Sequence, residues 1–485
     1  MPNLLDTALQ DFPRNEIWRL QTDGWQACRG PDNFRPSYYQ GMEAGFNFLR
    51  RFDDVHITPE FIEHIYFSAY QYESAFKNER ICRQGYCESV NEFAIVLPLP
   101  GLEAIAGVSL AGIDELVTMI QSSYESQGSR EFPQNEIGIM KPGMSYSRVI
   151  SFNDFATPNE FKNMLIKQLE LASATLRLYT GPVNISDDEM TRVDLISNAA
   201  TREEILTFVQ NDIDQYYAEL QRAQAITDPE HRKASEIMAI NRFIRKLHQS
   251  HYFPDGNGRT FIFLLANLLH LQNGHGLKIT EFPAHYAGFS SYELLIETRT
   301  DLDNFNAFKI TKAKEYFGNL SPETIIGDKE GTKRELTDRL NPNPLIALAQ
   351  IDELFIQVLE KKIQVPVGHV PSKSLTKKTI KSLTGPSTST IAHDHAKILL
   401  KELYLETLVR VVQNDAHNDI TQRLGYGANT QTPVEILRSI LFRHDLAKAC
   451  GPDKIEPIIT QLSNDALLAS TCSSAASSEP PSFKS

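Results

Sequence analysis

One polar stretch in the middle of the chain holds the residue types that could do chemistry. A histidine can accept a proton near neutral pH, and an aspartate offers the hard oxygen that Mg²⁺ takes beside substrate phosphates. Two glycines and an arginine follow the aspartate within the next four residues. The stretch reads His251-Tyr252-Phe253-Pro254-Asp255-Gly256-Asn257-Gly258-Arg259.

The second half of this stretch is suited to an anion. Gly256 and Gly258 can adopt the positive φ values that turn successive N–H groups to one side, at the point where a helix begins. Arg259 adds a forked cation, and Asn257 adds a neutral donor. The segment predicts a phosphate cradle that lies beside a base and a metal ligand.

Two helices must position this segment. Before it, apolar residues at helical spacing predict an amphipathic helix; they are Ile237, Ile240, Ile244 and Leu247. After it, residues 261–271 are apolar nearly all round, which is typical of a buried helix. The motif is therefore predicted to be a loop between an amphipathic helix and a buried one.

The loop resembles the signature of the Fic (Fido) family, usually written H-P-F-x-[DE]-G-N-G-R-x-x-R. The chain departs within the nine residues at Tyr252, where the family usually has Pro. The resemblance implies a helical core in which His251 takes the proton from a target hydroxyl, Phe253 anchors the loop and Asp255 holds Mg²⁺. It also implies that the donor phosphates are bound by Gly256, Asn257, Gly258 and Arg259.

Members of this family most often transfer AMP from ATP to a Ser, Thr or Tyr hydroxyl of a protein, and some transfer other phosphate-containing groups. The resemblance thus implies a Mg²⁺-dependent protein adenylyltransferase or a related transferase that uses ATP or another pyrophosphate-containing donor. The alternative is a catalytically degenerate Fic-fold protein that acts as a partner-binding module.

Two family features are missing. The second Arg of the signature is Ile262 here, which removes a cation associated with the outer phosphates and weakens the expectation of ATP. The self-inhibitory motif [ST]-x-x-x-E-[GN] is also absent, because Glu330-Gly331 has Ile326 at the hydroxyl position. We expect control by a partner, or no control.

Helix-start signals predominate along the chain, so the sequence predicts a mainly α fold. A hydroxyl followed three residues later by Glu can form a capping box, and this pattern begins at Thr157, Ser186, Thr201, Thr227 and Thr432. Strand signals are sparse by comparison, and the best of them lie at residues 93–97 and 146–152. Residues 141–149 are similar to the flap of Fic proteins, a short β-hairpin that clamps an extended target segment.

The predicted organisation has four parts. An extension covers residues 1–34, and a Fic-like catalytic domain covers 35–315 with an insertion at about 175–230. A helical region follows at 320–460. Its separation from the catalytic domain rests on the turn residues at 327–331 and 341–344. A flexible tail, poor in large apolar residues, covers 464–485. Tyr and Phe residues at helical spacing around 37–47 and 61–72 are assigned to the core.

Composition excludes several classes. The net charge of −13 disfavours binding to nucleic acid through phosphates. Five cysteines without a C-x-x-C pair indicate neither a disulfide framework nor a thiolate zinc site. No apolar run approaches the ~20 residues of a spanning helix, so we expect a soluble protein without a transmembrane segment.

Other polar clusters have simpler explanations. His248 with His251 gives H-x-x-H, but zinc would need Asp255 as a third ligand, and a dipole contact at the helix end explains His248 better. His393-Asp394-His395 is typical of a helix start. The lysine-rich stretch 361–381 is a solvated loop by default, with a partner or an anionic lipid as the alternative.

The last residues, Ser-Ser-Glu-Pro-Pro-Ser-Phe-Lys-Ser, resemble C-terminal signals read by type IV secretion systems. Fic-type effectors of intracellular bacteria act after such delivery. The expectation is a protein of the bacterial cytoplasm that is delivered into a host cytosol, where it modifies a host protein. A tail without a role is the alternative.

Overall fold

The computed structural model describes most of the central part of the chain. The described residues are 3–22, 35–78, 81–86, 91–96, 107–118, 136–140, 148–151, 192–197, 201–360 and 388–414, with a few single residues and pairs between 157 and 167. They form two compact units. The first unit consists of Met1–Gln10, Trp18–Ala27 and Pro31–Phe305, and the second of Asp11–Ile17, Cys28–Gly30 and Asn306–Ser485.

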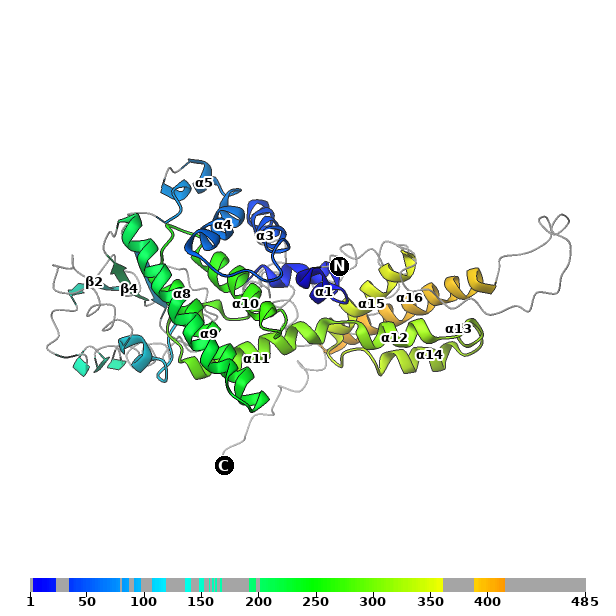
Figure 1. Ribbon diagram of the computed structural model, residues 1–485. Helices are drawn as coiled ribbons and strands as arrows, with labels where there is room; N and C mark the ends of the chain where they lie inside the picture. The colour runs from blue at the N-terminus through cyan, green and yellow to red at the C-terminus, as the bar shows by residue number, and fades with distance from the viewer. Residues whose placement is uncertain are drawn as a thin grey trace, which may run out of the picture. The chain divides into compact units, whose positions relative to one another are not determined.

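The first unit is mainly helical, as the sequence predicts (Figure 1). Its longer helices are α3 (Pro36–Leu49), α4 (Pro59–Tyr70), α8 (Arg202–Gln224), α9 (Pro229–Ser250) and α11 (Ser291–Phe308), the last of which ends at the start of the second unit. Shorter ones are α1 (Leu4–Leu9), α5 (Ser74–Asn78) and α10 (Ala266–Gln272). The 3₁₀ segments η3 (Ile81–Arg83) and η8 (Pro283–Ala287) also belong to this unit, whereas η1 (Arg14–Leu20) begins in the second unit and ends in the first.

Among the residues that the structure describes, the helix starts follow the sequence signals with one exception, and the starts expected at Ser186 and Thr432 lie outside the described residues. The Thr58 side chain accepts a hydrogen bond from the Phe61 N–H, and Thr201 forms a complete capping box with Glu204. The exception is α9, where the expected cap Thr227 is wrong. Asp228 caps this helix instead, because Pro229 occupies the first helical position directly after it.

Strands form in both stretches where the sequence predicts them, 93–97 and 146–152, and both strands belong to one four-stranded sheet. Strands β2 (Glu136–Met140) and β3 (Arg148–Ser151) pair antiparallel, with Glu136 opposite Ser151. The sheet has the order β1-β4-β2-β3, in which β4 (Arg192–Ser197) pairs antiparallel with both β1 (Asn91–Val96) and β2. Part of the stretch expected as an insertion thus supplies an inner strand. The flap segment 141–147 lies outside the described residues.

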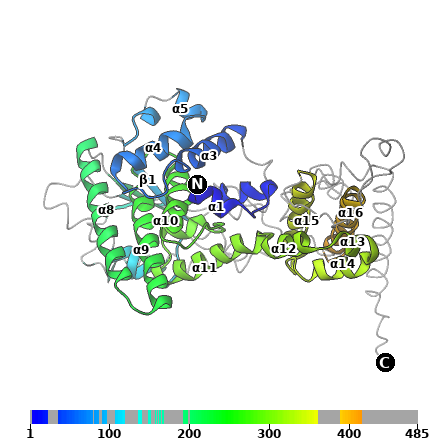
Figure 2. The same ribbon diagram turned by 45° about the vertical axis from the view of Figure 1, so that its right-hand side comes forward.

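Two helix pairs frame the centre of the first unit. Helix α8 lies alongside α9, and α3 lies alongside α4, as both views show (Figures 1 and 2). The apolar stripe of α9 is fully buried; it comprises Ile237, Ile240, Ile244 and Leu247. Behind the motif loop, the π-helical segment η7 (Gly258–Leu265) continues into α10, and its apolar side chains are buried all round.

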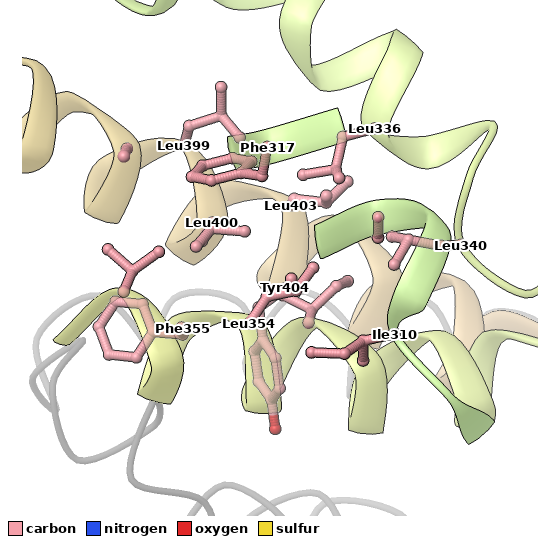
Figure 3. Close-up of a cluster of buried hydrophobic side chains, with 14 of the residues drawn as sticks. Ile310, Phe317, Leu336, Leu340, Leu354, Phe355, Leu399, Leu400, Leu403 and Tyr404 are labelled. Carbon is pink, nitrogen blue, oxygen red and sulfur yellow. The ribbon is translucent and has the colours of Figure 1, made fainter. Parts of the chain in front are cut away.

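The second unit is a helical bundle with an apolar core. It contains α12 (Thr311–Asn319), α13 (Pro322–Gly327), α14 (Lys329–Thr337), α15 (Pro344–Leu359) and α16 (Thr388–Asn414). Phe317, Leu354 and Leu400 lie near the middle of the core, where side chains from several helices meet (Figure 3). The expected turn at 327–331 is wrong in its second half, because Asp328 caps α14 and Gly331 already lies within that helix.

Residues 361–381 and the tail 464–485 lie outside the described part of the chain. Across the helices that the structure describes, none combines the length and apolar character needed to cross a bilayer.

Candidate functional site

The motif loop begins where α9 ends. His251 is the C-cap of α9 and adopts the left-handed conformation, with φ 48° and ψ 48°. Among the described residues it is the one non-glycine with positive φ. Helices that end this way usually place Gly at this position, because a side chain there is strained. A histidine kept in this conformation indicates a functional demand on its position.

The His251 ring is held as a neutral base. Its Nδ1 lies 3.1 Å from the carbonyl oxygen of His248, and since a carbonyl can only accept, Nδ1 carries the proton. The lone pair is then on Nε2. Burial lowers the pKa of His251 below its usual 6.5, against the opposing effects of the His248 carbonyl and the Asp255 charge. Near neutral pH the ring is therefore able to accept a proton.

Phe253 fixes the loop to the protein interior. Its ring is fully buried and stacks on Tyr66 at 4.2 Å and on Tyr86 at 4.7 Å between centroids. Three nearly parallel rings thus hold the middle of the loop in one place.

Tyr252 ties the loop to α8. Its hydroxyl donates to Oδ2 of Asp212 at 3.1 Å, and its ring is buried. Burial raises the pKa of Asp212 to about 6, while Lys246 and the Tyr252 hydroxyl act in the opposite direction. A proline, usual at this position in the resembled family, could not make this bond. The chain has a tyrosine in place of this proline, and α8 supplies the carboxylate that the tyrosine hydroxyl binds.

Asn257 shapes the loop from within. Its Oδ1 accepts from the Phe253 N–H at 3.1 Å, and its Nδ2 donates to the Phe253 carbonyl at 2.8 Å. The side chain is buried, so it closes the loop onto itself. This bracing role was missed by the sequence analysis, and the phosphate contact predicted for Asn257 has only the second amide proton available to it.

Asp255 is exposed at the tip of the loop. Its Oδ2 accepts from the Tyr70 hydroxyl, and its Oδ1 accepts from the Gly256 N–H at 2.6 Å. Burial raises the pKa of Tyr70, which keeps that hydroxyl a donor. Each carboxylate oxygen retains a lone pair, and one carboxylate that works beside substrate phosphates is a normal donor set for Mg²⁺. Asp255 therefore fits this ion.

The glycines leave room in front of the helix. Gly256 has φ 75°, and a Cβ there would come within 3.0 Å of the Tyr70 ring. At Gly258, the first residue of η7, a Cβ would meet no atom within 4 Å. The space beside the N–H groups of this helix start is thus open, as a bound phosphate would require.

Arg259 is held by residues from the start of α3, the end of α4 and the turn between α4 and α5. Its Nη1 donates to Oε1 of Glu73 at 2.7 Å, and its guanidinium carbon lies 4.4 Å from the Tyr38 ring centroid and 5.2 Å from that of Tyr70. The side chains of Arg259 and Glu73 are 17% and 10% exposed. One of five donors is used by Glu73, so the guanidinium retains others for an anion.

The predicted site residues thus share one loop, and most of their supports lie far away in sequence. Helical spacing assigned the rings of Tyr38 and Tyr70 to the core, and nothing local marked Glu73 or Asp212. Ile262, at the position of the second arginine in the resembled signature, is a buried apolar residue. Within the described ranges, no group of three His, Cys, Asp or Glu side chains is placed to hold a metal ion by itself.

Comparisons with known proteins add one relative. No family model matches the chain. The chain is similar to the phosphocholine transferase AnkX of Legionella pneumophila, with 27% identity over 195 residues. The match covers 38% of this chain and 19% of that protein, so the chain spans about a fifth of the length of this relative.

Proposed function

We propose that the chain transfers a phosphate-linked group, phosphocholine rather than AMP, from a pyrophosphate-containing donor to a Ser, Thr or Tyr hydroxyl of a protein. The observation that carries the proposal is the motif loop, which holds His251 as a neutral base beside an exposed carboxylate and an arginine. The similarity to a phosphocholine transferase supports the choice of group.

In this proposal the target hydroxyl gives its proton to Nε2 of His251 while its oxygen attacks the phosphorus of the transferred group. A new oxygen–phosphorus bond forms, and the phosphoanhydride bond of the donor breaks. The electron pair of that bond leaves with a nucleoside monophosphate. Arg259 and the N–H groups at the start of η7 would hold the phosphates. Mg²⁺ at Asp255 would offset the charge of the pyrophosphate.

AMP transfer from ATP is the second candidate. It would need a cation for the outer phosphates, and the position that carries one in the resembled family is the buried Ile262. A nucleoside diphosphate that bears choline has no third phosphate to hold. The missing cation therefore favours phosphocholine over AMP.

The test is an intact-mass measurement of the protein, and of added candidate target proteins, after incubation with Mg²⁺ and either cytidine diphosphate choline or ATP. A mass gain of one phosphocholine group is expected with the first donor. Asp255→Ala should abolish both the gain and its dependence on Mg²⁺. A gain of AMP from ATP would select the second candidate. If neither donor changes the mass of any protein, the partner-binding alternative is left.

We further propose that the target is a host protein reached after secretion, with the last residues of the tail, 477–485, as the signal. Deletion of residues 466–485, followed with a reporter fusion in infected cells, tests this separately. Undiminished delivery would rule out the tail as a signal and leave the transferase proposal intact.

A further inference from the structure

Tyr70, the last residue of α4, contacts three residues of the motif loop at once. Its hydroxyl donates to Oδ2 of Asp255. The face of its ring lies 5.2 Å from the guanidinium carbon of Arg259. Its Cδ2 would lie 3.0 Å from a Cβ built on Gly256, so the backbone of the loop packs directly on the ring. One side chain thus meets the predicted metal ligand, the predicted phosphate cation and the glycine between them.

The position of this ring is set by packing. Tyr70 is fully buried and stacks on Tyr66 at 5.4 Å and 20°. Tyr66 in turn stacks on Phe253 at 4.2 Å and 6°. Phe76 meets Tyr70 edge-on at 6.2 Å. The aromatic column from Phe253 to Tyr70 therefore links the anchor of the loop to the residue that contacts its tip.

The polar bonds of Asp255 depend on this column. Asp255 is exposed, and an exposed carboxylate without fixed partners would rotate freely. Here one oxygen is bonded to the Gly256 N–H at 2.6 Å and the other to the Tyr70 hydroxyl. With both oxygens bonded, the carboxylate plane has one orientation.

We propose that Tyr70 is a positioning residue that fixes the Asp255 carboxylate for a divalent cation and sets its placement relative to Arg259. The inference rests on the proposed function, because it assigns a metal-bound donor to the same loop. The role proposed for Tyr70 involves no direct contact with the donor. It acts through Asp255, as a hydrogen-bonded partner orients a metal-ligating carboxylate.

The test removes the hydroxyl and keeps the ring, as Tyr70→Phe. Mn²⁺ is titrated in the presence of inorganic pyrophosphate, and free Mn²⁺ is read by electron paramagnetic resonance. Loss of such a supporting partner typically weakens metal affinity by about 10–100-fold, and we expect a shift in that range. In the transfer assay, the Mg²⁺ concentration for half-maximal rate should rise, while the rate at saturating Mg²⁺ should largely recover.

Tyr66→Phe is the matched control. Tyr66 belongs to the same column and also donates a buried hydroxyl bond, but this bond goes to the Cys82 carbonyl, at 2.9 Å, instead of to the Asp255 carboxylate. We expect both variants to lower the thermal unfolding midpoint by similar amounts. Only Tyr70→Phe should lower the affinity for Mn²⁺.

A Mn²⁺ affinity in Tyr70→Phe within about twofold of the parent would overturn the inference, as would an equal loss in Tyr66→Phe. A parent protein that binds no Mn²⁺ would overturn it together with the metal part of the proposed function. If Mn²⁺ binds and Tyr70→Phe weakens it, yet no phosphocholine is transferred, the inference stands and the proposed function fails.

Discussion

The two units of the molecule place their buried polar side chains differently. In the first unit, one such side chain, Asn257, lies within the motif loop and forms directional bonds to its backbone. In the second unit, buried polar side chains such as Gln350 and Gln357 lie on α15, beside an apolar cluster that includes Phe317 and Leu354. A bundle needs only apolar surfaces of matching shape, whereas a loop of fixed conformation needs directional bonds. The bonds that fix the shape of the candidate site therefore lie in the first unit.

The largest expected change in stability lies in the second unit. Phe317→Ala removes a fully buried ring from the apolar cluster, and truncations of this kind cost about 3–5 kcal/mol. In chemical denaturation, the variant should unfold at a lower denaturant concentration than the parent. The transfer rate per folded molecule should be unchanged under native conditions. A transfer rate per folded molecule that falls together with the stability would show that the packing of the second unit also affects the reaction.

The next effect concerns donor binding in the first unit. Arg259→Ala should weaken binding of cytidine diphosphate choline, because bonds to charged groups contribute about 1.5–3 kcal/mol. Calorimetry measures this affinity. Arg202→Ala is the control, since Arg202 also forms a partly buried ion pair, with Glu63 at 2.6 Å, and its guanidinium donates further to the carbonyls of Gln84 and Tyr86, outside the loop. Equal donor affinity in Arg259→Ala and the parent would place the phosphate cradle elsewhere.

A smaller effect should separate the two asparagines that brace the protein backbone. Asn257→Ala leaves the buried N–H and carbonyl of Phe253 without partners, at about 1–3 kcal/mol. Asn267→Ala should cost a similar amount, because Asn267 binds the Phe263 carbonyl and the Lys278 N–H in the same way outside the loop. Only Asn257→Ala should also slow transfer. Equal rates in the two variants would show that the loop shape does not limit the reaction.

The smallest expected effect is a shift in the pH profile. Burial lowers the pKa of His251 below 6.5, so its neutral form persists to lower pH than that of an exposed histidine. The acidic limb of kcat/KM should therefore have its midpoint below pH 6.5. Steady-state rates between pH 5 and 8 measure it. A midpoint at or above 6.5 would indicate that another group titrates, or that the ring is less buried during the reaction.

Local signals predicted much of the fold. The spacing of Ile237, Ile240, Ile244 and Leu247 correctly predicted the buried face of α9, and the capping box at Thr201 was correctly read from two residues. Such signals act within a few residues of each other, so a sequence pattern records them.

The supports of the loop could not be predicted in this way. Tyr70 and Asp255 are separated by 185 positions and Glu73 and Arg259 by 186, and no periodic pattern links such distant partners. A tyrosine at helical spacing is equally compatible with a core contact and with a bond to a functional carboxylate. Only the packing of α4 against the loop distinguishes the two.

The most direct test of the central claim is the release of cytidine monophosphate from cytidine diphosphate choline in the parent and in His251→Ala, with donor binding confirmed by calorimetry in both. Removal of a general base typically costs about 10²–10⁴-fold, so the variant should bind donor normally and release product that much more slowly. His231→Ala, at an exposed position of the same helix, should match the parent. A rate in His251→Ala within about tenfold of the parent would contradict the account.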